Sequence, residues 1–126
     1  MPTTLRLSPV KIAKYRAAAQ ERRQQERSEI DALQEKAWEA ARRAAQLLKE
    51  QFQVSRVVVF GSLARGTGFT RWSDVDVAAW DIAPEDTFRA IGAVMDLDTD
   101  VPVNLVDVNT ARPSLLTTIE RDGIEL

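Results

Sequence analysis

The chain has 126 residues, the length of one ordinary domain with a single core. It contains no cysteine and no histidine, which excludes disulfides, thiolate or histidine catalysis, and metal sites built on either residue. Any metal would need oxygen ligands, a donor set that favours hard cations such as Mg²⁺ or Mn²⁺.

The net charge of −2 is unevenly distributed. Residues 1–53 carry 11 Lys and Arg against 7 Asp and Glu, whereas residues 54–126 carry 6 against 12. The basic part is either a solvated helix or a surface for an acidic partner or weak nucleic-acid contact. The acidic remainder argues against sequence-specific DNA binding as the main task.

The N-terminus does not have the pattern of a secretory signal. Its apolar cluster is short and is interrupted by Lys11, Lys14 and Arg16. No apolar run approaches the roughly 20 residues of a membrane span. We therefore expect a cytoplasmic protein with no membrane association.

A long helix is predicted from Ser8-Pro9 to about Gln51. Ser8 suits the N-cap and Pro9 the first helical position, and the stretch after Pro9 is rich in strong helix formers and contains no glycine or further proline. Apolar residues recur at helical spacing in two groups. The first group is Ile12, Tyr15 and Ala19, and the second is Ile30, Leu33, Ala37, Ala41, Ala44 and Leu48.

The polar segment 20–29 between the two groups allows two interpretations. One continuous helix would keep both stripes in phase, whereas Ser28-x-x-Asp31 resembles a capping box that would restart a second helix and fold the first back. We predict one helix whose N-terminal half projects, so that 1–45 is a helical extension and 46–126 the domain. The projecting stripe would then pack on a second copy of the chain or on a helical partner.

The remaining sequence alternates between strand and helix patterns, which predicts a small α/β fold. The run VSRVVVF at Val54–Phe60 is apolar almost throughout and indicates a strand buried on both faces. The other elements expected, in chain order, are a strand at Val75–Trp80, a helix at Pro84–Asp96 with a stripe of Phe88, Ile91 and Met95, a strand at Val101–Val108, a helix at Thr110–Asp122 closed by Gly123 at C′, and a short edge strand at Ile124–Leu126.

Two features of the sequence suit a nucleoside triphosphate and its cation. Gly61 and Ser62 end the first strand, where free backbone N–H groups and a hydroxyl could face phosphate oxygens. Asp74 and Asp76 lie at i and i+2, so their side chains share one face of the second strand. Two carboxylates this close repel each other unless a divalent cation lies between them. Each feature alone is common, and their combination is far more specific.

This combination resembles the nucleotidyltransferase superfamily of DNA polymerase beta, and specifically its minimal nucleotidyltransferase branch. The residues that carry the resemblance are Gly61, Ser62, Ala64, Arg65, Gly66, Ser73, Asp74 and Asp76, with the strand at Val101–Val108 and the end of the chain. It implies a small mixed sheet with helices packed on one side. It also implies that Asp74 and Asp76 are catalytic and bind the metal, and that Gly61, Ser62, Arg65 and Ser73 contact the nucleotide.

The resemblance also implies a reaction and a partner. Members move a nucleoside monophosphate from a triphosphate, here ATP with Mg²⁺ or Mn²⁺, to a hydroxyl. Many minimal members act as antitoxins of HEPN-domain ribonucleases, some by adenylylating the toxin. The expected partner is accordingly a helical, HEPN-like protein.

One residue departs from the family pattern. The third metal-binding carboxylate of the family lies on the next strand, where this chain has Asn104. Asparagine offers a carbonyl oxygen but no charge. Asp107 is three residues further on and points to the opposite face, so it could substitute only through a bulge.

Asn104 therefore leaves two further functions open beside catalysis. One is a degenerate module that neutralises its partner by contact alone. The other is a nucleotide sensor that binds ATP without turnover. Trp72, directly before the carboxylates, is either solvated or a contact for a base or a partner.

Overall fold

The computed structural model describes residues 8–126. Its longest element is α1 (Pro9–Gln51), a single helix of 43 residues that extends about 65 Å. The Ser8 side chain accepts a hydrogen bond from Lys11 N at 3.2 Å, as an N-cap does. The prediction of one continuous helix is confirmed, and the chain does not restart a helix at Ser28.

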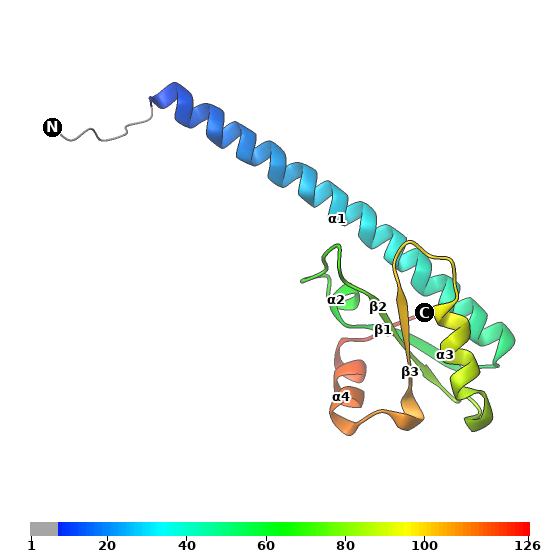
Figure 1. The fold of residues 1–126 in the computed structure, drawn as a ribbon. Helices are drawn as coiled ribbons and strands as arrows, with labels where there is room; N and C mark the ends of the chain where they lie inside the picture. Colours follow the sequence, from blue (N-terminus) through cyan, green and yellow to red (C-terminus); the bar gives the residue numbers. More distant parts are fainter. Residues whose placement is uncertain (1–7) are drawn as a thin grey trace.

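The N-terminal half of α1 projects from the rest of the molecule, as predicted (Figure 1). Its buried positions begin at Ala37 and end at Leu48. Since α1 crosses residue 45 without a break, the boundary between an extension and a domain at that position stays a prediction. Within the described residues, no helix is both long enough and apolar enough to cross a membrane.

The body of the molecule is a four-stranded mixed sheet with the strand order β3-β2-β1-β4. β1 runs antiparallel to β2 and β4, and β2 runs parallel to β3. The strands are β1 (Arg56–Phe60), β2 (Val75–Trp80), β3 (Val103–Asp107) and β4 (Ile124–Glu125). The remaining helices are α2 (Ser62–Arg65), α3 (Thr87–Met95) and α4 (Pro113–Asp122), with 3₁₀ turns η1 (Pro84–Asp86) and η2 (Val108–Thr110).

Helices cover both faces of this sheet. The C-terminal half of α1 and α3 pack on the face that contains Val57 and Val59, whereas Ile119 of α4 packs on Val58 and Phe60 of the other face. The α/β fold class is as predicted, but the placement of all helices on one side does not hold for α4. The reason lies in β1, because a strand that is apolar and buried from Val57 to Phe60 needs a cover on each face.

Of the predicted stripe on α3, Ile91 packs against the core as a half-buried side chain, but Phe88 and Met95 do not. Phe88 is 88% exposed and Met95 66% exposed, while Ala90 and Val94 are buried against the sheet. Thr87 Oγ1 donates a hydrogen bond to Asp107 Oδ2 at 2.8 Å, and this contact anchors the first turn of α3. The anchored turn directs Ala90 and Val94 inward, three and seven positions on.

Candidate functional site

The two predicted carboxylates lie at the edge of the sheet face that α4 covers. Asp76 is in register with Phe60 on β1 and with Asn104 on β3. Asp74 directly precedes β2, and its Oδ2 accepts a hydrogen bond from Asn104 Nδ2 at 3.1 Å. The structure therefore brings Asp74, Asp76 and Asn104 into one polar cluster.

Gly61, the residue directly after β1, lies next to this cluster. It has a φ of 82° and a ψ of −156°, a conformation that favours glycine. A Cβ atom at this position would lie 2.8 Å from Asp76 Oδ2. The backbone of Gly61 thus packs directly against the carboxylate, and no larger residue fits without moving Asp76.

Ser62 and Arg65 follow on α2, next to Gly61. The carbonyl of Gly61 accepts the first bond of this helical turn, from Arg65 N at 3.0 Å. Ser62 is half-buried, while Arg65 is exposed. The positive charge of Arg65 acts on Asp76 and lowers the pKa of its carboxyl group, although other contributions outweigh it. Arg65 therefore lies within range of the charge of Asp76, and a contact of Ser62 or Arg65 with a nucleotide stays a prediction.

Ser73 has a local role in the loop before β2. Its Oγ accepts a hydrogen bond from Thr70 N at 2.8 Å, and its own N–H donates to Thr70 O at 3.0 Å. These two bonds close a tight turn that sets the position of Asp74. A contact between Ser73 and a nucleotide stays a prediction.

The net effect of its surroundings raises the pKa of Asp76 above the ordinary value of an aspartate. Burial of the carboxylate is the largest cause. The side-chain hydrogen bond of Asn104 lowers the pKa, the negative charge of Asp74 raises it further, and Arg65 lowers it. The ionised form of Asp76 is therefore costly in the folded protein unless a cation approaches it.

This shift predicts how stability depends on pH without a divalent cation. The folded protein binds more protons than the unfolded chain between the ordinary pKa of 3.8 and the raised pKa of Asp76. Unfolding free energy should fall as pH rises through that window. Asp76→Asn is expected to melt above wild type at neutral pH in a chelator, with the difference shrinking toward pH ~4.

Calorimetry or circular dichroism at several pH values checks this expectation. The exposed Asp96→Asn variant is the matched control, because it removes one carboxylate outside the cluster, and it should melt close to wild type throughout. An Asp76→Asn variant that melts below wild type at neutral pH would contradict the assignment of Asp76 as a destabilising buried charge.

Asp107 does not substitute for the carboxylate that Asn104 lacks. The pairing of β2 with β3 is continuous from Val75↔Val103 to Ala79↔Asp107, so no bulge turns Asp107 around. Asp107 is buried on the opposite face, where it accepts hydrogen bonds from Thr87 Oγ1 and from Asn109 N at 3.0 Å. Its role is to join β3 to α3 and η2.

The chemistry of the cluster fits one divalent cation better than two. Asp74 and Asp76 supply two hard anionic donors, and Asn104 supplies an amide oxygen once its side chain is turned. Among residues 8–126, no group of three Asp or Glu side chains is placed so that it could hold a metal ion. The two negative charges of Asp74 and Asp76 suit one divalent cation. A second cation would need a third carboxylate, which the cluster lacks.

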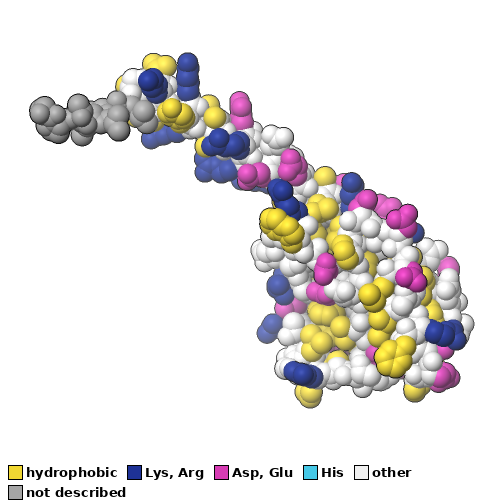
Figure 2. Space-filling model, in the orientation of Figure 1, with side chains coloured by type: hydrophobic (Ala, Val, Ile, Leu, Met, Phe, Trp, Pro, Cys, Tyr) yellow, Lys and Arg dark blue, Asp and Glu magenta, His cyan; other side chains and the backbone are white. Residues whose placement is uncertain are grey.

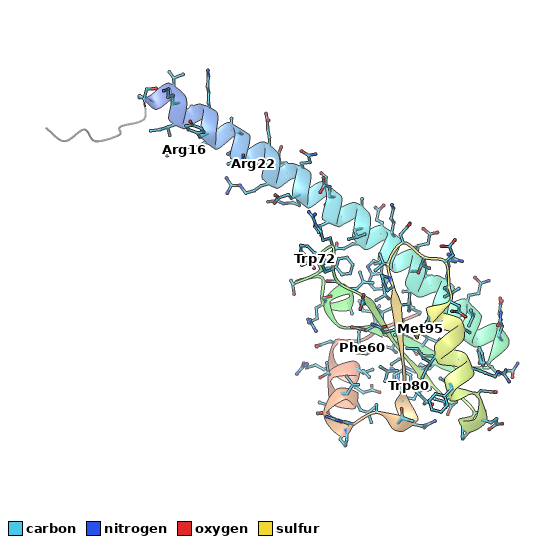
Figure 3. The ribbon with its side chains drawn as sticks, viewed as in Figure 1. Arg16, Arg22, Phe60, Trp72, Trp80 and Met95 are labelled. Atoms are coloured by element: carbon cyan, nitrogen blue, oxygen red, sulfur yellow. The ribbon has the colours of Figure 1, made fainter. Side chains whose placement is uncertain are left out.

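A groove that the sequence did not reveal runs between α1 and the loop before β2. It has a volume of about 400 Å³ and is lined by Glu26, Glu29, Ile30, Leu33, Thr70, Arg71 and Trp72. Trp72 is 82% exposed and lies beside α1, away from Phe60 in the sheet (Figure 3). Sequence reasoning missed the groove because its two walls are some 40 residues apart in the chain.

Comparisons with known proteins agree with this geometry. The family model of polymerase beta nucleotidyltransferases matches residues 43–126. Two solved structures of the toxin–antitoxin MntA–HpeT in mutant forms are 21% and 19% identical, with TM-scores of 0.53 and 0.54, and cover 68% of this chain and 69% and 70% of theirs. A toxin–antitoxin with AMP-PNP is 22% identical over 66% of this chain and 69% of its own, with a TM-score of 0.50. No curated protein matches.

At these identities the solved structures support the fold alone, a small mixed sheet of the nucleotidyltransferase kind. The family model is the stronger finding, because it covers more than half of the chain and contains the whole carboxylate cluster. The chain therefore belongs to the polymerase beta nucleotidyltransferase family.

Proposed function

We propose that the protein is a divalent-cation-dependent nucleotidyltransferase that moves AMP from ATP to a hydroxyl of a partner protein. The observation that carries the proposal is the backbone of Gly61 packed against the carboxylate of Asp76, with Asp74 and Asn104 in the same cluster. This arrangement places a glycine backbone, which suits an anionic ligand, beside a pair of negative charges that suits its cation.

Each residue of the cluster then has a role. Asp74 and Asp76 would hold Mg²⁺ or Mn²⁺, with the amide oxygen of Asn104 as a neutral donor. A bound cation would neutralise the pair and polarise the triphosphate. The N–H groups and hydroxyl at Gly61-Ser62 would orient the phosphates, and Arg65 would pair with their charge. Ser73 would hold the loop that positions Asp74.

The reaction itself exchanges a phosphoanhydride bond of ATP for a phosphoester bond to the acceptor. The acceptor oxygen forms a bond to the α-phosphorus while the bond from that phosphorus to the β-phosphate oxygen breaks and pyrophosphate leaves. The hydroxyl proton would pass to a carboxylate of the cluster.

The partner is proposed from the family resemblance and from the fold. The similar solved structures are described as toxin–antitoxin proteins, one of them with AMP-PNP. We infer that this protein is an antitoxin that modifies a helical, HEPN-type ribonuclease in the cytoplasm.

Label transfer from ATP tests the proposal. Incubation with α-labelled ATP, the partner, and Mg²⁺ or Mn²⁺ should label the partner, and a chelator or Asp74→Ala should abolish the labelling. The Asp96→Ala variant serves as the control, because Asp96 is exposed outside the cluster. Absence of transfer from all four nucleoside triphosphates with either cation would refute the proposal.

Asn104 favours a second candidate function, a module that neutralises its partner by contact alone. Such a module needs its surface but not its carboxylates. Asp74→Ala would then leave neutralisation intact, whereas deletion of residues 1–27 would abolish it. The catalytic proposal requires the reverse result for Asp74→Ala.

The Asn104→Asp variant tests how far the missing carboxylate limits cation binding and transfer. The hydrogen bond from Asn104 to Asp74 would be replaced by charge repulsion, so the variant is expected to melt below wild type in a chelator. Mn²⁺ should raise its melting temperature more than that of wild type, and its transfer rate should rise by about tenfold or more. Equal cation-induced shifts in both proteins would show that position 104 does not face the cation.

A further inference from the structure

Two surfaces on α1 lie outside the nucleotidyltransferase site and have complementary properties. The first, which we term the basic stripe, consists of Ile12, Tyr15 and Ala19 with Lys11 and Arg16 beside them. Tyr15 is 62% exposed and Ile12 36% exposed, although both are large and apolar. Nothing in the described part of the chain covers them, because this half of α1 projects from the body (Figure 2).

The second surface is the groove between α1 and the loop, which we term the Trp72 groove. Its apolar part is formed by Ile30, Leu33 and the exposed ring of Trp72. Glu26 and Glu29 line it as well, and they outnumber the single basic residue of its lining, Arg71, which lies over the Trp72 ring. A ligand for this groove would have an apolar ridge flanked by positive charges, and those are the properties of the basic stripe.

The stripe and the groove lie on the same side of the helix. A helix turns about 100° per residue, so Ile12, Ala19 and Ile30 fall on one line along α1. Ile12 and Ile30 are separated by about 27 Å along the axis, with their midpoint near Glu21. Two α1 helices that pack antiparallel about this midpoint would place the Ile12 of each copy against the Ile30 of the other.

Charge along α1 favours this antiparallel arrangement. Residues 8–20 carry three basic side chains and no acidic one. Residues 26–39 carry five acidic side chains against two basic ones. Antiparallel pairing brings the positive end of each helix to the negative segment of the other, whereas parallel pairing would place like charges together.

We propose that the protein forms a two-fold symmetric dimer in which the basic stripe of each copy docks in the Trp72 groove of the other. The interface is isologous, so both contacts form at once from one pair of surfaces. Trp72 lies two residues before Asp74. Dimer formation therefore buries the exposed indole of Trp72 beside Tyr15 of the second copy.

A charge-swap experiment on the full-length chain tests the dimer. The first variant combines Lys11→Glu with Arg16→Glu, which makes the stripe acidic. The second combines Glu26→Lys with Glu29→Lys, which makes the groove basic. All four side chains are exposed, so both variants should fold as wild type does.

Sedimentation equilibrium then gives a pattern that only reciprocal docking produces. Wild type should dimerise at concentrations of about 10 µM, and each variant alone should associate roughly tenfold or more weakly. An equimolar mixture of the two variants should recover the dimer, because each stripe then meets a groove of opposite charge. The Val10→Lys variant is the control, since Val10 is 66% exposed on the other side of the helix, and it should dimerise as wild type does.

Three results would overturn the proposal. The first is a wild-type protein that stays monomeric at about 100 µM in low salt. The second is a mixture of the two variants that stays monomeric although each variant is folded. The third is a monomeric wild type whose binding to a helical partner is lost on Lys11→Glu with Arg16→Glu, which would assign the stripe to that partner.

Discussion

Gly61→Ala is expected to lower nucleotidyl transfer by about a hundredfold, with only a modest loss of stability. The new Cβ would lie 2.8 Å from Asp76 Oδ2, and the carboxylate can rotate away. The fold therefore survives, but the cation ligand is displaced. The φ of 82° with a ψ of −156° lies in a region that is essentially restricted to glycine and adds a strain of about 1–3 kcal/mol.

Gly66→Ala separates the effect of backbone strain from the effect of displacing Asp76. Gly66 has a similar φ of 74°, but a Cβ at this position would meet nothing within 4 Å. The variant should lose about 1–2 kcal/mol of stability, because Gly66 has a left-handed conformation with a ψ of 7°, and should keep its transfer activity. Equal activity losses in Gly61→Ala and Gly66→Ala would show that backbone strain, not displacement of Asp76, disturbs the site.

Gly123→Ala is expected to be the most destabilising single substitution of a glycine. The φ of Gly123 is −71°, which any residue adopts, so its requirement is one of space. A Cβ would lie 2.3 Å from Val58 Cγ1 and 2.4 Å from the carbonyl oxygen of Ile119. Because the second contact is with backbone, α4 would have to move off the sheet, at a cost of about 3 kcal/mol.

Thermal unfolding measures this cost as a fall in melting temperature of roughly 10 °C. The matched substitution is Gly92→Ala in α3, where a Cβ would meet nothing within 4 Å. That variant should melt at or above wild type, because alanine favours a helix by about 1 kcal/mol over glycine. A Gly123→Ala variant as stable as Gly92→Ala would contradict the packing of α4 on β1.

Much of the fold could be predicted from local sequence patterns. The absence of glycine and proline from residues 10–51 predicted one helix, and runs of β-branched residues located the three long strands. The positions of Asp74 and Asp76 at i and i+2 predicted one shared face, and the register of β2 with β3 adds Asn104 to it.

Other features depend on contacts between segments that are far apart in the chain, and local sequence patterns do not reveal such contacts. The stripe of Phe88, Ile91 and Met95 satisfied helical spacing, yet only Ile91 of the three packs on the core, and the bond from Thr87 to Asp107 that anchors α3 joins segments 20 residues apart. The apolar run in β1 implied that a helix covers the second face of the sheet, as α4 does. The family resemblance, however, favoured helices on one side only. The Trp72 groove could not be predicted, because it depends on where the loop before β2 lies relative to α1.

Calorimetric titration with ATP tests most directly whether Asp74 and Asp76 form a cation-dependent nucleotide site. ATP should bind to wild type in the presence of Mg²⁺ or Mn²⁺, and a chelator should abolish that binding. Asp76→Asn should weaken it by about tenfold or more, while Asp96→Asn leaves it unchanged. Equal ATP affinity in wild type and Asp76→Asn, or no ATP binding by wild type with either cation, would contradict the account.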